Sequence, residues 1–326
     1  MRSLEHLITD FIAHREDGQR VALVTLIANT GSSPRPLGSQ MVVSEDGRSV
    51  GYLTGGCAES VIVSEAVAAI EAQANRQIRL GLGSPYMDIQ LPCGAGIDIY
   101  IDVTLCDETA RQINSSLRHR TPVALDTCLE TGRHQTVISH KQTVKNGVFR
   151  RWYLPRRRLL IMGKGPNTTA LACLGTATDY EVDVLSPDRK TRDACSSEGI
   201  EAKTLKPPEM IDAVPLDAWT AAVLLFHEHD WEPAILKALL TSDCFYIGAL
   251  GSRSTHEDRI CQLEGLGLGK EVDRIHGPVG LDIKAMTPTE IAISILAEIT
   301  FAYRSENSLP SLVSSSSCSS HTSSLT

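Results

Sequence analysis

The sequence lacks the segments that would direct the chain to a membrane or out of the cell. No run approaches the roughly 18 apolar residues of a membrane span. The first residues, MRSLEHLITDFIAHRED, form an amphipathic helix pattern without the apolar core of a signal peptide. The nine cysteines include no C-x-x-C pair, which favours a reducing compartment over a disulfide framework. We therefore expect a cytoplasmic protein without a membrane partner.

The sequence also lacks an excess of positive charge. Its net charge is −8 and its pI is about 5.7, which argue against nucleic acid or an anionic membrane as the main partner. At 326 residues the chain is longer than most single cores, so two domains are expected.

One stretch, residues 157–175 (RRLLIMGKGPNTTALACLG), joins an apolar strand to a helix through a glycine turn. Gly163 and Gly165 leave a bare backbone in front of a helix N-terminus, which is how dinucleotide-binding folds approach a phosphate. Thr168 occupies the third glycine position of G-x-G-x-x-G and tolerates close helix packing less well. On this pattern alone, phosphate binding and a plain strand-to-helix turn are both open.

Two later strands of this half end in polar loops. The apolar run at 221–226 leads into His227-Glu228-His229-Asp230, and the run at 245–247 leads into GALGSR. In an open parallel sheet both loops would lie at the carboxyl edge, where such folds bind ligands. His227 is a candidate ligand residue, and an exposed loop imidazole is the alternative. The candidate anion-binding residues of the second loop are Gly248, Gly251, Ser252 and Arg253.

The second strand of this half, residues 181–185, should end in the acid that binds a ribose 2′-hydroxyl. Here the sequence continues Ser186-Pro187-Asp188-Arg189, so the acid is displaced. This argues against ordinary NAD recognition.

The first half carries a cysteine on a glycine turn. A buried strand at 21–28 leads to a polar loop that contains Arg35, and a hairpin with Asp46-Gly47 at its turn follows. The hairpin runs into Gly55-Gly56-Cys57, and a helix pattern begins at Ser60. Cys57 would therefore sit among unpaired amides at a helix N-terminus, which favour a thiolate. A small residue packed at a crowded turn is the alternative.

A second cysteine, Cys93, precedes Gly94 on another glycine-rich loop, and the two cysteines could converge on one ligand. Residues 97–103 alternate apolar and polar, which predicts a half-buried strand with Asp98, Tyr100 and Asp102 on its polar face.

The domain boundaries follow from changes of pattern. We expect an N-terminal α/β domain over 1–105, a connecting helix and small sheet over 106–155, and a doubly wound parallel sheet over 156–304. The last helix of this domain starts with a capping box at Thr287 and Glu290. Its apolar residues lie on nearly all sides of the helix, which predicts burial. The Ser-rich tail, 305–326, is expected to be disordered.

The motifs resemble those of a known family. GSSPRPLGSQMVV followed by GGCAES is similar to the N-terminal module of the XdhC/CoxI family, the accessory proteins of molybdenum hydroxylases. LLIMGKGPNTTALA, LLFHEHD, YIGALGSRSTHEDR and HGPVGLDIKAMTPTEIAISILAEI resemble that family's C-terminal Rossmann module. The resemblance spans about residues 1–304.

The resemblance implies a maturation factor rather than a catalyst. It would bind molybdenum cofactor, molybdopterin, as cargo, protect it while a cysteine desulfurase installs the terminal sulfido ligand, and deliver it to an apo xanthine dehydrogenase-type hydroxylase. Carried over by motif, Cys57 and Cys93 are the reactive cysteines, and Cys57 is the candidate molybdenum ligand. A homodimer is expected.

Two other functions compete with this one. An NAD(P)-dependent oxidoreductase would use the Rossmann module directly, but it requires an acid after the second strand and a catalytic Lys, Tyr or His, for which the sequence offers no clear set. A zinc-binding protein that uses His227, His229 and cysteines lacks any standard ligand spacing.

Overall fold

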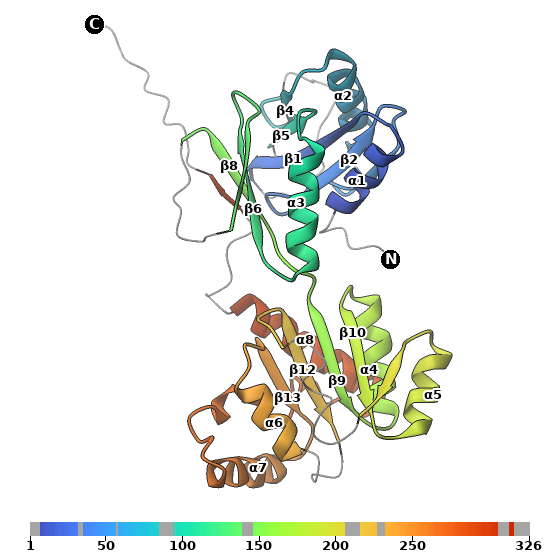
Figure 1. Cartoon of the computed structure of the whole chain (residues 1–326), viewed down its shortest axis with the longest axis vertical. Coiled ribbons are helices and arrows are strands. Elements are labelled where there is room, and N and C mark those ends of the chain that lie inside the picture. Colours follow the sequence, from blue (N-terminus) through green and yellow to red (C-terminus); the bar gives the residue numbers. More distant parts are fainter. Residues whose placement is uncertain are drawn as a thin grey trace, which may run out of the picture. The chain divides into compact units, whose positions relative to one another are not determined.

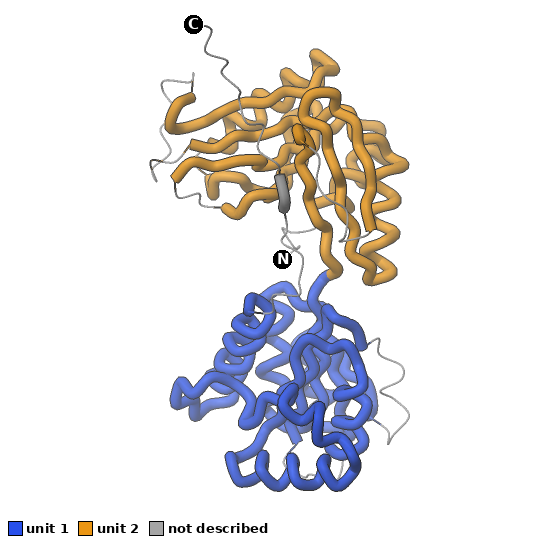
Figure 2. The backbone as a smooth tube through the Cα atoms, turned by 90° about the vertical axis from the view of Figure 1, so that its left-hand side faces the viewer, with its two compact units in different colours: residues 1, 156–309 blue, residues 2–155, 310–326 orange. Residues whose placement is uncertain are grey.

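The chain forms two compact units (Figure 2). The N-terminal unit comprises residues 2–155 with 310–326 (orange), and the C-terminal unit comprises residues 156–309 (blue). The structure is a computed structural model that describes residues 7–31, 35–56, 58–84, 94, 96–138, 146–205, 216–226, 232–305 and 313–315. The division falls directly after Pro155.

An antiparallel five-stranded sheet lies at the centre of the N-terminal unit. Its order is β3-β2-β1-β5-β4, so β1 is the middle strand (Figure 1). The hairpin of β2 and β3 turns at Gly47, whose φ of 80° suits a glycine, as the Asp-Gly pair predicted. The strands are β1 Val21–Thr30, β2 Gln40–Ser44, β3 Ser49–Gly51, β4 Arg76–Gly81 and β5 Gly96–Asp102.

Three helices cover the two faces of this sheet, and both faces of β1 are buried. Alternate side chains of a strand point to opposite faces. Val24 packs in one apolar cluster with Ile62 of α2, and Leu23 packs in another with Phe11 of α1 and Ile113 of α3. Burial on both faces explains why β1 is a continuous apolar run. The helices are α1 Ile8–Glu16, α2 Glu59–Ala72 and α3 Asp107–Arg118.

A second, four-stranded antiparallel sheet follows α3 in the order β15-β8-β6-β7. The helix and small sheet expected within 106–155 are present as α3 and the strands β6, β7 and β8. The tail differs from the expectation of complete disorder, because three of its residues pair with Phe149, Arg150 and Arg151 of β8. An edge strand offers unpaired backbone groups that an extended segment can take up, whatever its composition. The strands are β6 Val123–Cys128, β7 His134–Val137, β8 Val148–Tyr153 and β15 Val313–Ser315.

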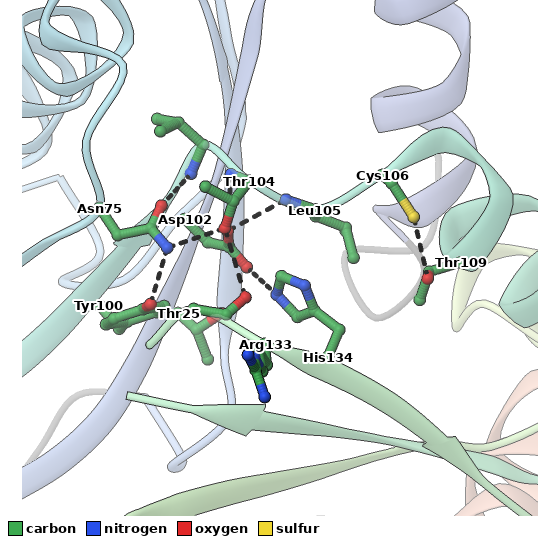
Figure 3. A network of polar contacts seen from close by, with 12 residues as sticks. Thr25, Asn75, Tyr100, Asp102, Thr104, Leu105, Cys106, Thr109, Arg133 and His134 are labelled. Carbon is green, nitrogen blue, oxygen red and sulfur yellow. Dashed lines mark hydrogen bonds and ion pairs between the residues drawn. The ribbon is translucent and has the colours of Figure 1, made fainter. Parts of the chain in front are cut away.

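Two of the three residues on the predicted polar face of β5 are buried, so the strand is covered more fully than the prediction of a half-buried strand allowed. Tyr100 and Asp102 are each only 3% exposed. Oδ2 of Asp102 lies 2.6 Å from Nε2 of His134 on β7, while Oδ1 accepts hydrogen bonds from the amides of Thr104 (2.9 Å) and Leu105 (3.1 Å), as Figure 3 shows. Tyr100 and Asp102 thus contact the second sheet, through Phe149 and His134, rather than water.

Asn75, between α2 and β4, extends this network. Its Nδ2 donates to the hydroxyl of Tyr100 (2.9 Å) and to Oγ1 of Thr104 (2.8 Å), and its Oδ1 accepts from the amide of Val103 (2.8 Å). Burial, with a smaller contribution from the charge of Asp102, raises the pKa of Tyr100 to about 12. Because buried polar groups need partners, the network fixes the turn from β5 into α3 and attaches β7 to it.

Six parallel strands form the sheet of the C-terminal unit, in the order β11-β10-β9-β12-β13-β14 (Figure 1). Counted from β9, this is the order 3-2-1-4-5-6 of the doubly wound dinucleotide-binding folds, so the predicted fold class is confirmed. The strands are β9 Arg158–Gly163, β10 Glu181–Ser186, β11 Ala202–Thr204, β12 Thr220–Leu225, β13 Tyr246–Ala249 and β14 Ile275–His276.

Helices cover both faces of this sheet. Leu159 and Ile161 of β9 pack in a cluster with residues of α4, α5 and α8, whereas Leu160 and Met162 pack with residues of α6 and α7. The helices are α4 Pro166–Ala177, α5 Arg189–Ser197, α6 Glu232–Leu240, α7 Arg253–Gly265 and α8 Pro288–Ser305, with a short 3₁₀ helix, η3, at Val272–Arg274.

Close approach of α4 to the sheet occurs at Gly175 and not at the third position of the glycine motif. A Cβ on Gly175 would lie 2.7 Å from Cδ2 of Leu159 and 3.1 Å from Cγ2 of Val182. Thr168 is fully buried in the first turns of the same helix. The helix therefore accommodates a threonine near its start because its tight contact is near its end.

The capping box of α8 is present, but the helix is not buried all round. The amide of Thr287 donates to Glu290 at 2.9 Å, and the amide of Glu290 donates to Oγ1 of Thr287 at 3.3 Å. Ile293 and Phe301 are 50% and 67% exposed, so the prediction of complete burial is wrong. An apolar surface that runs round a helix does not tell which side the sheet covers.

In the part of the chain that the structure describes, no helix has the length and apolar character needed to cross a membrane.

We expect His134→Leu to lower the free energy of unfolding of the N-terminal unit by about 3 kcal/mol, because it leaves a buried carboxylate without one of its partners. Urea unfolding followed by hydrogen exchange in peptides from residues 96–138 separates this unit from the other. Arg15→Gln is the control, since the Arg15–Asp107 pair in the same unit is partly exposed and should change stability by less than about 1 kcal/mol. Equal stability of the His134 variant and the parent would contradict a structural role for the network.

Candidate functional site

Three loops of the N-terminal unit leave the five-stranded sheet at one edge. Gly96, which begins β5, pairs with Thr30 at the end of β1 and with Gly81 at the end of β4. On the other side of β1, Gly51 at the end of β3 pairs with Met41 near the start of β2. In an antiparallel sheet these strand ends lie at the same edge. We call it the loop edge, and its loops are residues 31–39, 52–58 and 82–95.

Every site residue predicted in the first half belongs to a loop of this edge. Arg35 is half-buried, and Gly55, Gly56 and Gly94 are exposed. Cys57 and Cys93 lie outside the described residues. The register of the sheet thus brings together the ends of loops that the sequence could only describe separately.

Glu59, the first residue of α2, folds back over the turn that precedes it. Its Oε1 accepts hydrogen bonds from the amides of Leu53 (3.2 Å) and Thr54 (2.8 Å). Its Oε2 accepts from the amides of Gly56 (2.8 Å) and Ala58 (3.2 Å) and from the hydroxyl of Thr54 (2.5 Å). Burial raises the pKa of Glu59, but these hydrogen bonds outweigh it and leave the pKa below its ordinary value. One carboxylate therefore holds the turn on both sides of position 57.

The sequence argument for Cys57 depends on unpaired amides around position 57, and the structure describes the residues on either side of it. That argument placed the thiol among unpaired amides, but the amides of Gly56 and Ala58 are already bonded to Glu59. The helix itself begins at Glu59, with Ala58 as its N-cap.

The two glycines before Cys57 are required by the backbone conformation of the turn. Gly55 has a φ of 79° and Gly56 a φ of 111°, values that side-chain-bearing residues rarely adopt. Among the described residues other than the chain neighbours, no atom lies within 4 Å of the position a Cβ would take on either glycine, so the requirement for glycine here is conformational.

In the C-terminal unit, the predicted glycine turn lies at the carboxyl edge of the parallel sheet, beside the point where the strand order reverses. Gly163 ends β9, and a Cβ there would lie 2.6 Å from the carbonyl oxygen of Leu225 on β12. Gly165 is the N-cap of α4 with a φ of 84°. The loop after β12, which contains His227, lies outside the described residues.

The displaced acid after β10 has an internal role. Asp188 is the N-cap of α5 and accepts hydrogen bonds from the amide (2.9 Å) and the hydroxyl (2.6 Å) of Thr191. The same hydroxyl oxygen accepts from the amide of Gly165 at 2.8 Å. Hydrogen bonds from Thr191 hold the pKa of Asp188 below its ordinary value. The carboxylate expected at a ribose and an amide expected at a pyrophosphate thus belong to one internal chain of hydrogen bonds.

Only part of the Gly248–Arg253 loop is open to a ligand. Gly248 lies inside β13, where a Cβ would be 2.5 Å from Cγ2 of Val279, so this glycine serves packing rather than the binding role assigned to it from the sequence. Ser252 caps α7 by accepting from the amide of Thr255 at 3.1 Å, and both Ser252 and Arg253 are exposed. These two residues begin α7, where a helix N-terminus attracts anions.

A buried ion pair under this loop was missed by the sequence analysis. Nε of Arg259 lies 2.9 Å from Oε2 of Glu232, and both side chains are 3% exposed. Nη2 of Arg259 also donates to the carbonyl of Leu250 at 2.7 Å. The pair connects the start of α6 with the middle of α7, but the two residues are 27 positions apart and no local pattern marks them.

Cys106 was also missed, and it has the surroundings that were predicted for Cys57. It is the exposed N-cap of α3. A hydrogen bond with the hydroxyl of Thr109, followed by the amides of Thr109 and Glu108, lowers the pKa of Cys106 (Figure 3). The sequence signal for this helix start was the segment Cys-Asp-Glu-Thr, in which a cysteine directly precedes an acidic first helical turn.

Among the described residues, no group of three or more His, Cys, Asp or Glu side chains is placed to hold a metal ion.

The fold, the loop edge of the N-terminal unit and the carboxyl edge of the parallel sheet define a class of protein. Its members have an antiparallel α/β unit with a glycine-rich loop edge, followed by a Rossmann unit. A family described as the XdhC Rossmann domain matches residues 159–299, and one described as the XdhC and CoxI family matches residues 14–81. The chain belongs to the XdhC and CoxI family, and the resemblance seen in its motifs is confirmed.

Individual relatives agree with this assignment. A molybdenum cofactor insertion chaperone, PaoD of Escherichia coli K12, is 34% identical over 287 residues, which cover 86% of this chain and 83% of PaoD. A probable xanthine dehydrogenase subunit of Bacillus subtilis 168 is 26% identical over 326 residues, with 87% of this chain and 93% of the relative covered. A crystal structure from Bacillus halodurans, described as a xanthine dehydrogenase, has the same fold, with a TM-score of 0.78, 23% identity, and coverage of 95% of this chain and 98% of that one.

We expect Glu59→Gln to loosen the turn at residues 53–58, because an amide group would face backbone N–H donors where one carboxylate oxygen now accepts from them. Loss of such charge-assisted hydrogen bonds should speed amide exchange in peptides from residues 52–60 by about tenfold. Glu290→Gln is the matched control, since Glu290 accepts amide hydrogen bonds at the start of α8 in the other unit. Unchanged exchange in the Glu59 variant would show that the turn is held by other contacts.

We also expect no saturable NADH binding up to about 1 mM, the upper end of ordinary KM values. The physical reason is that Asp188 and the amide of Gly165 are engaged with Thr191. Titration followed by NADH fluorescence measures this. Tight binding together with turnover of a carbonyl substrate would favour the dehydrogenase alternative.

Proposed function

We propose that this chain binds molybdenum cofactor, holds it while its terminal sulfido ligand is installed, and inserts it into a xanthine dehydrogenase-type molybdenum hydroxylase. Family membership and the name of the relative PaoD, a molybdenum cofactor insertion chaperone, support this function. The chain would then be a maturation factor, with the cofactor as its cargo.

The observation that carries the proposal is the convergence of three loops at the loop edge. They contain Arg35, Cys57 and Cys93, which are a cation and two thiols. Thiolates are soft ligands that suit molybdenum and sulfur chemistry, and a guanidinium suits a phosphate. In this proposal Cys57 contacts the metal and Cys93 is a second contact.

As a separate candidate, we propose an anion site within the C-terminal unit alone. Ser252 and Arg253 are exposed at the start of α7, and Gly165 caps α4 at the same edge of the parallel sheet. Helix N-termini and a guanidinium favour the phosphate of the pterin, or the nucleotide attached to it.

The dehydrogenase alternative is less favoured. It needs a free carboxylate after β10, whereas Asp188 caps α5 and binds Thr191. We therefore propose that NAD(P) is not a redox substrate of this protein.

The partners in this proposal are a cysteine desulfurase, which supplies the sulfur, and the apo-hydroxylase that receives the finished cofactor. The Bacillus subtilis relative, described as a probable xanthine dehydrogenase subunit, is consistent with such a client. We further propose a homodimer that acts in the cytoplasm, in keeping with cysteines that form no disulfide pattern.

We expect Cys57→Ala to reduce the molybdopterin that co-purifies with the protein by about tenfold or more and to abolish activation of the hydroxylase, because the metal loses a thiolate contact. Cys93→Ala should have a smaller effect. The measurements are molybdopterin content after anaerobic purification and hydroxylase activity in a reconstituted sulfuration assay.

Cys261→Ala is the control for these variants, since Cys261 is an exposed cysteine on α7 that the proposal does not use. Circular dichroism should show the same fold in all three variants. If the Cys57 variant retained the cofactor and activated the hydroxylase like the parent, the residue would be a packing residue and the binding site would have to lie in the Rossmann unit.

A further inference from the structure

Helix α8 carries a line of five residues on the side that faces away from the parallel sheet. Ile295 and Ile299 pack in an apolar cluster with residues of β9, which identifies the side that faces the sheet. At 3.6 residues per turn, the line lies on the opposite side, within about 40° of Ala297. Ala297 is partly buried and the other four residues are exposed. The line, which we call the α8 stripe, consists of Glu290, Ile293, Ala297, Phe301 and Arg304.

The middle of the α8 stripe is apolar. Ile293 is 50% exposed and Phe301 is 67% exposed, and Ala297 lies four residues from each. Single exposed apolar side chains are ordinary, but apolar residues spaced by one helical turn are the pattern of a helix that packs on another element. Leu281 adjoins the stripe, because its amide donates to the carbonyl oxygen of Ser294 (3.2 Å), and Leu281 is 42% exposed. The apolar surface therefore extends beyond the helix itself.

The residues of the α8 stripe are placed symmetrically about Ala297. The apolar pair, Ile293 and Phe301, lies four residues before and after it. The charged pair, Glu290 and Arg304, lies seven residues before and after it. When two copies of a helix pack antiparallel across a two-fold axis, each residue lies opposite the one equally far beyond the axis. Ile293 then meets Phe301 of the partner subunit. Glu290 likewise meets Arg304 of the partner subunit, and each contact occurs twice. A two-fold interface between identical chains needs such a self-complementary surface.

The charges at the two ends of the α8 stripe favour one orientation of the helices. Oε2 of Glu290 accepts hydrogen bonds from the amides of Met286 (2.8 Å) and Thr287 (2.9 Å), which hold the pKa of Glu290 below its ordinary value. Arg304 is exposed in the last turn of the same helix. Each charge suits the dipole of its own helix end. In an antiparallel pair each charge also faces its opposite, whereas a parallel pair would place like charges together.

We propose that the α8 stripe is the contact surface between two copies of this chain, packed antiparallel across a two-fold axis at Ala297. The small side chain at the axis lets the helices approach to the separation of about 8–10 Å that packed helices keep. The residues at 290 and 304 are about 21 Å apart along the helix, so the contact extends over four turns. The inference rests on the homodimer included in the proposed function and deepens it by naming its surface and orientation.

The first test is sedimentation equilibrium of the full-length protein between about 1 and 100 μM. The parent should be a dimer, and Phe301→Asp should raise the dimer Kd by about a hundredfold or more, because it removes an aromatic anchor at two symmetric places. Leu266→Asp is the matched control, since Leu266 is 55% exposed at the end of α7 in the same unit, and it should leave the Kd unchanged. A parent that is monomeric over this range, or a dimer unaffected by Phe301→Asp, would overturn the proposal.

The second test reverses the charges. Arg304→Glu should raise the Kd about tenfold or more, because two attractive contacts become repulsive, and Glu290→Arg should do the same. The double variant Glu290→Arg/Arg304→Glu should return to within about threefold of the parent, because both pairs re-form with their charges exchanged. Loss of the capping box is common to both Glu290 variants, so it cannot account for this recovery.

Arg189→Glu is the control for the charge variants, since the side chain of Arg189 on α5 is 86% exposed in the same unit, and its Kd should equal that of the parent. A double variant that associates no more tightly than Arg304→Glu would overturn the proposed contact.

Molybdopterin content after anaerobic co-purification separates this inference from the cofactor function. A dimeric parent without molybdopterin, in which the double variant recovers the parent Kd, would refute the cofactor function and support the α8 surface. A parent that holds molybdopterin but remains monomeric would support the cofactor function and overturn the α8 surface.

Discussion

The N-terminal unit depends on the position of β1, which lies in the middle of an antiparallel sheet with both faces buried. Its register with β2 and β5 is tightly constrained, because a slip of one residue would exchange Leu23 and Val24 between two different apolar clusters. That register places the end of β1 level with the end of β4, whereas the end of β3 is level with Val24, earlier on β1. The loop edge, and hence any site formed there, is a consequence of packing on the two faces of the sheet.

Charged side chains then hold the loops that the sheets leave exposed. Glu59 accepts hydrogen bonds from the amides of the turn around position 57, and Arg79 donates hydrogen bonds to the ends of two neighbouring loops. In the other unit, Asp188 caps α5, and Arg259 with Glu232 supports the loop before α7. Each charge is bonded to backbone or to an opposite charge, which is how a charged group is accommodated near or within a core. The glycines allow the backbone conformations of the turns, and these side chains fix the turns through hydrogen bonds.

The Rossmann unit keeps the strand order of a dinucleotide-binding fold but uses its recognition groups differently. Gly165 caps α4 as in such folds, yet its amide faces Thr191, and the acid after β10 serves the same threonine. The fold alone does not imply the usual ligand, since function depends on which groups remain available at the carboxyl edge. Among the described residues of this edge, Ser252 and Arg253 at the start of α7 are exposed.

The sequence by itself determined the local features: the Asp46-Gly47 hairpin, the capping box of Thr287, the glycine turn between β9 and α4, and the motifs that identify the family. Only the tertiary structure decided that Tyr100 and Asp102 are buried against a second sheet, that α4 meets the sheet at Gly175, and that Glu59 occupies the amides expected for a thiolate. The physical reason is that alternation and propensity act over a few residues. The burial of a strand face depends on residues distant in the chain, such as His134, which binds Asp102. Whether a backbone amide is free depends on which side chains can reach it, and no local pattern encodes that.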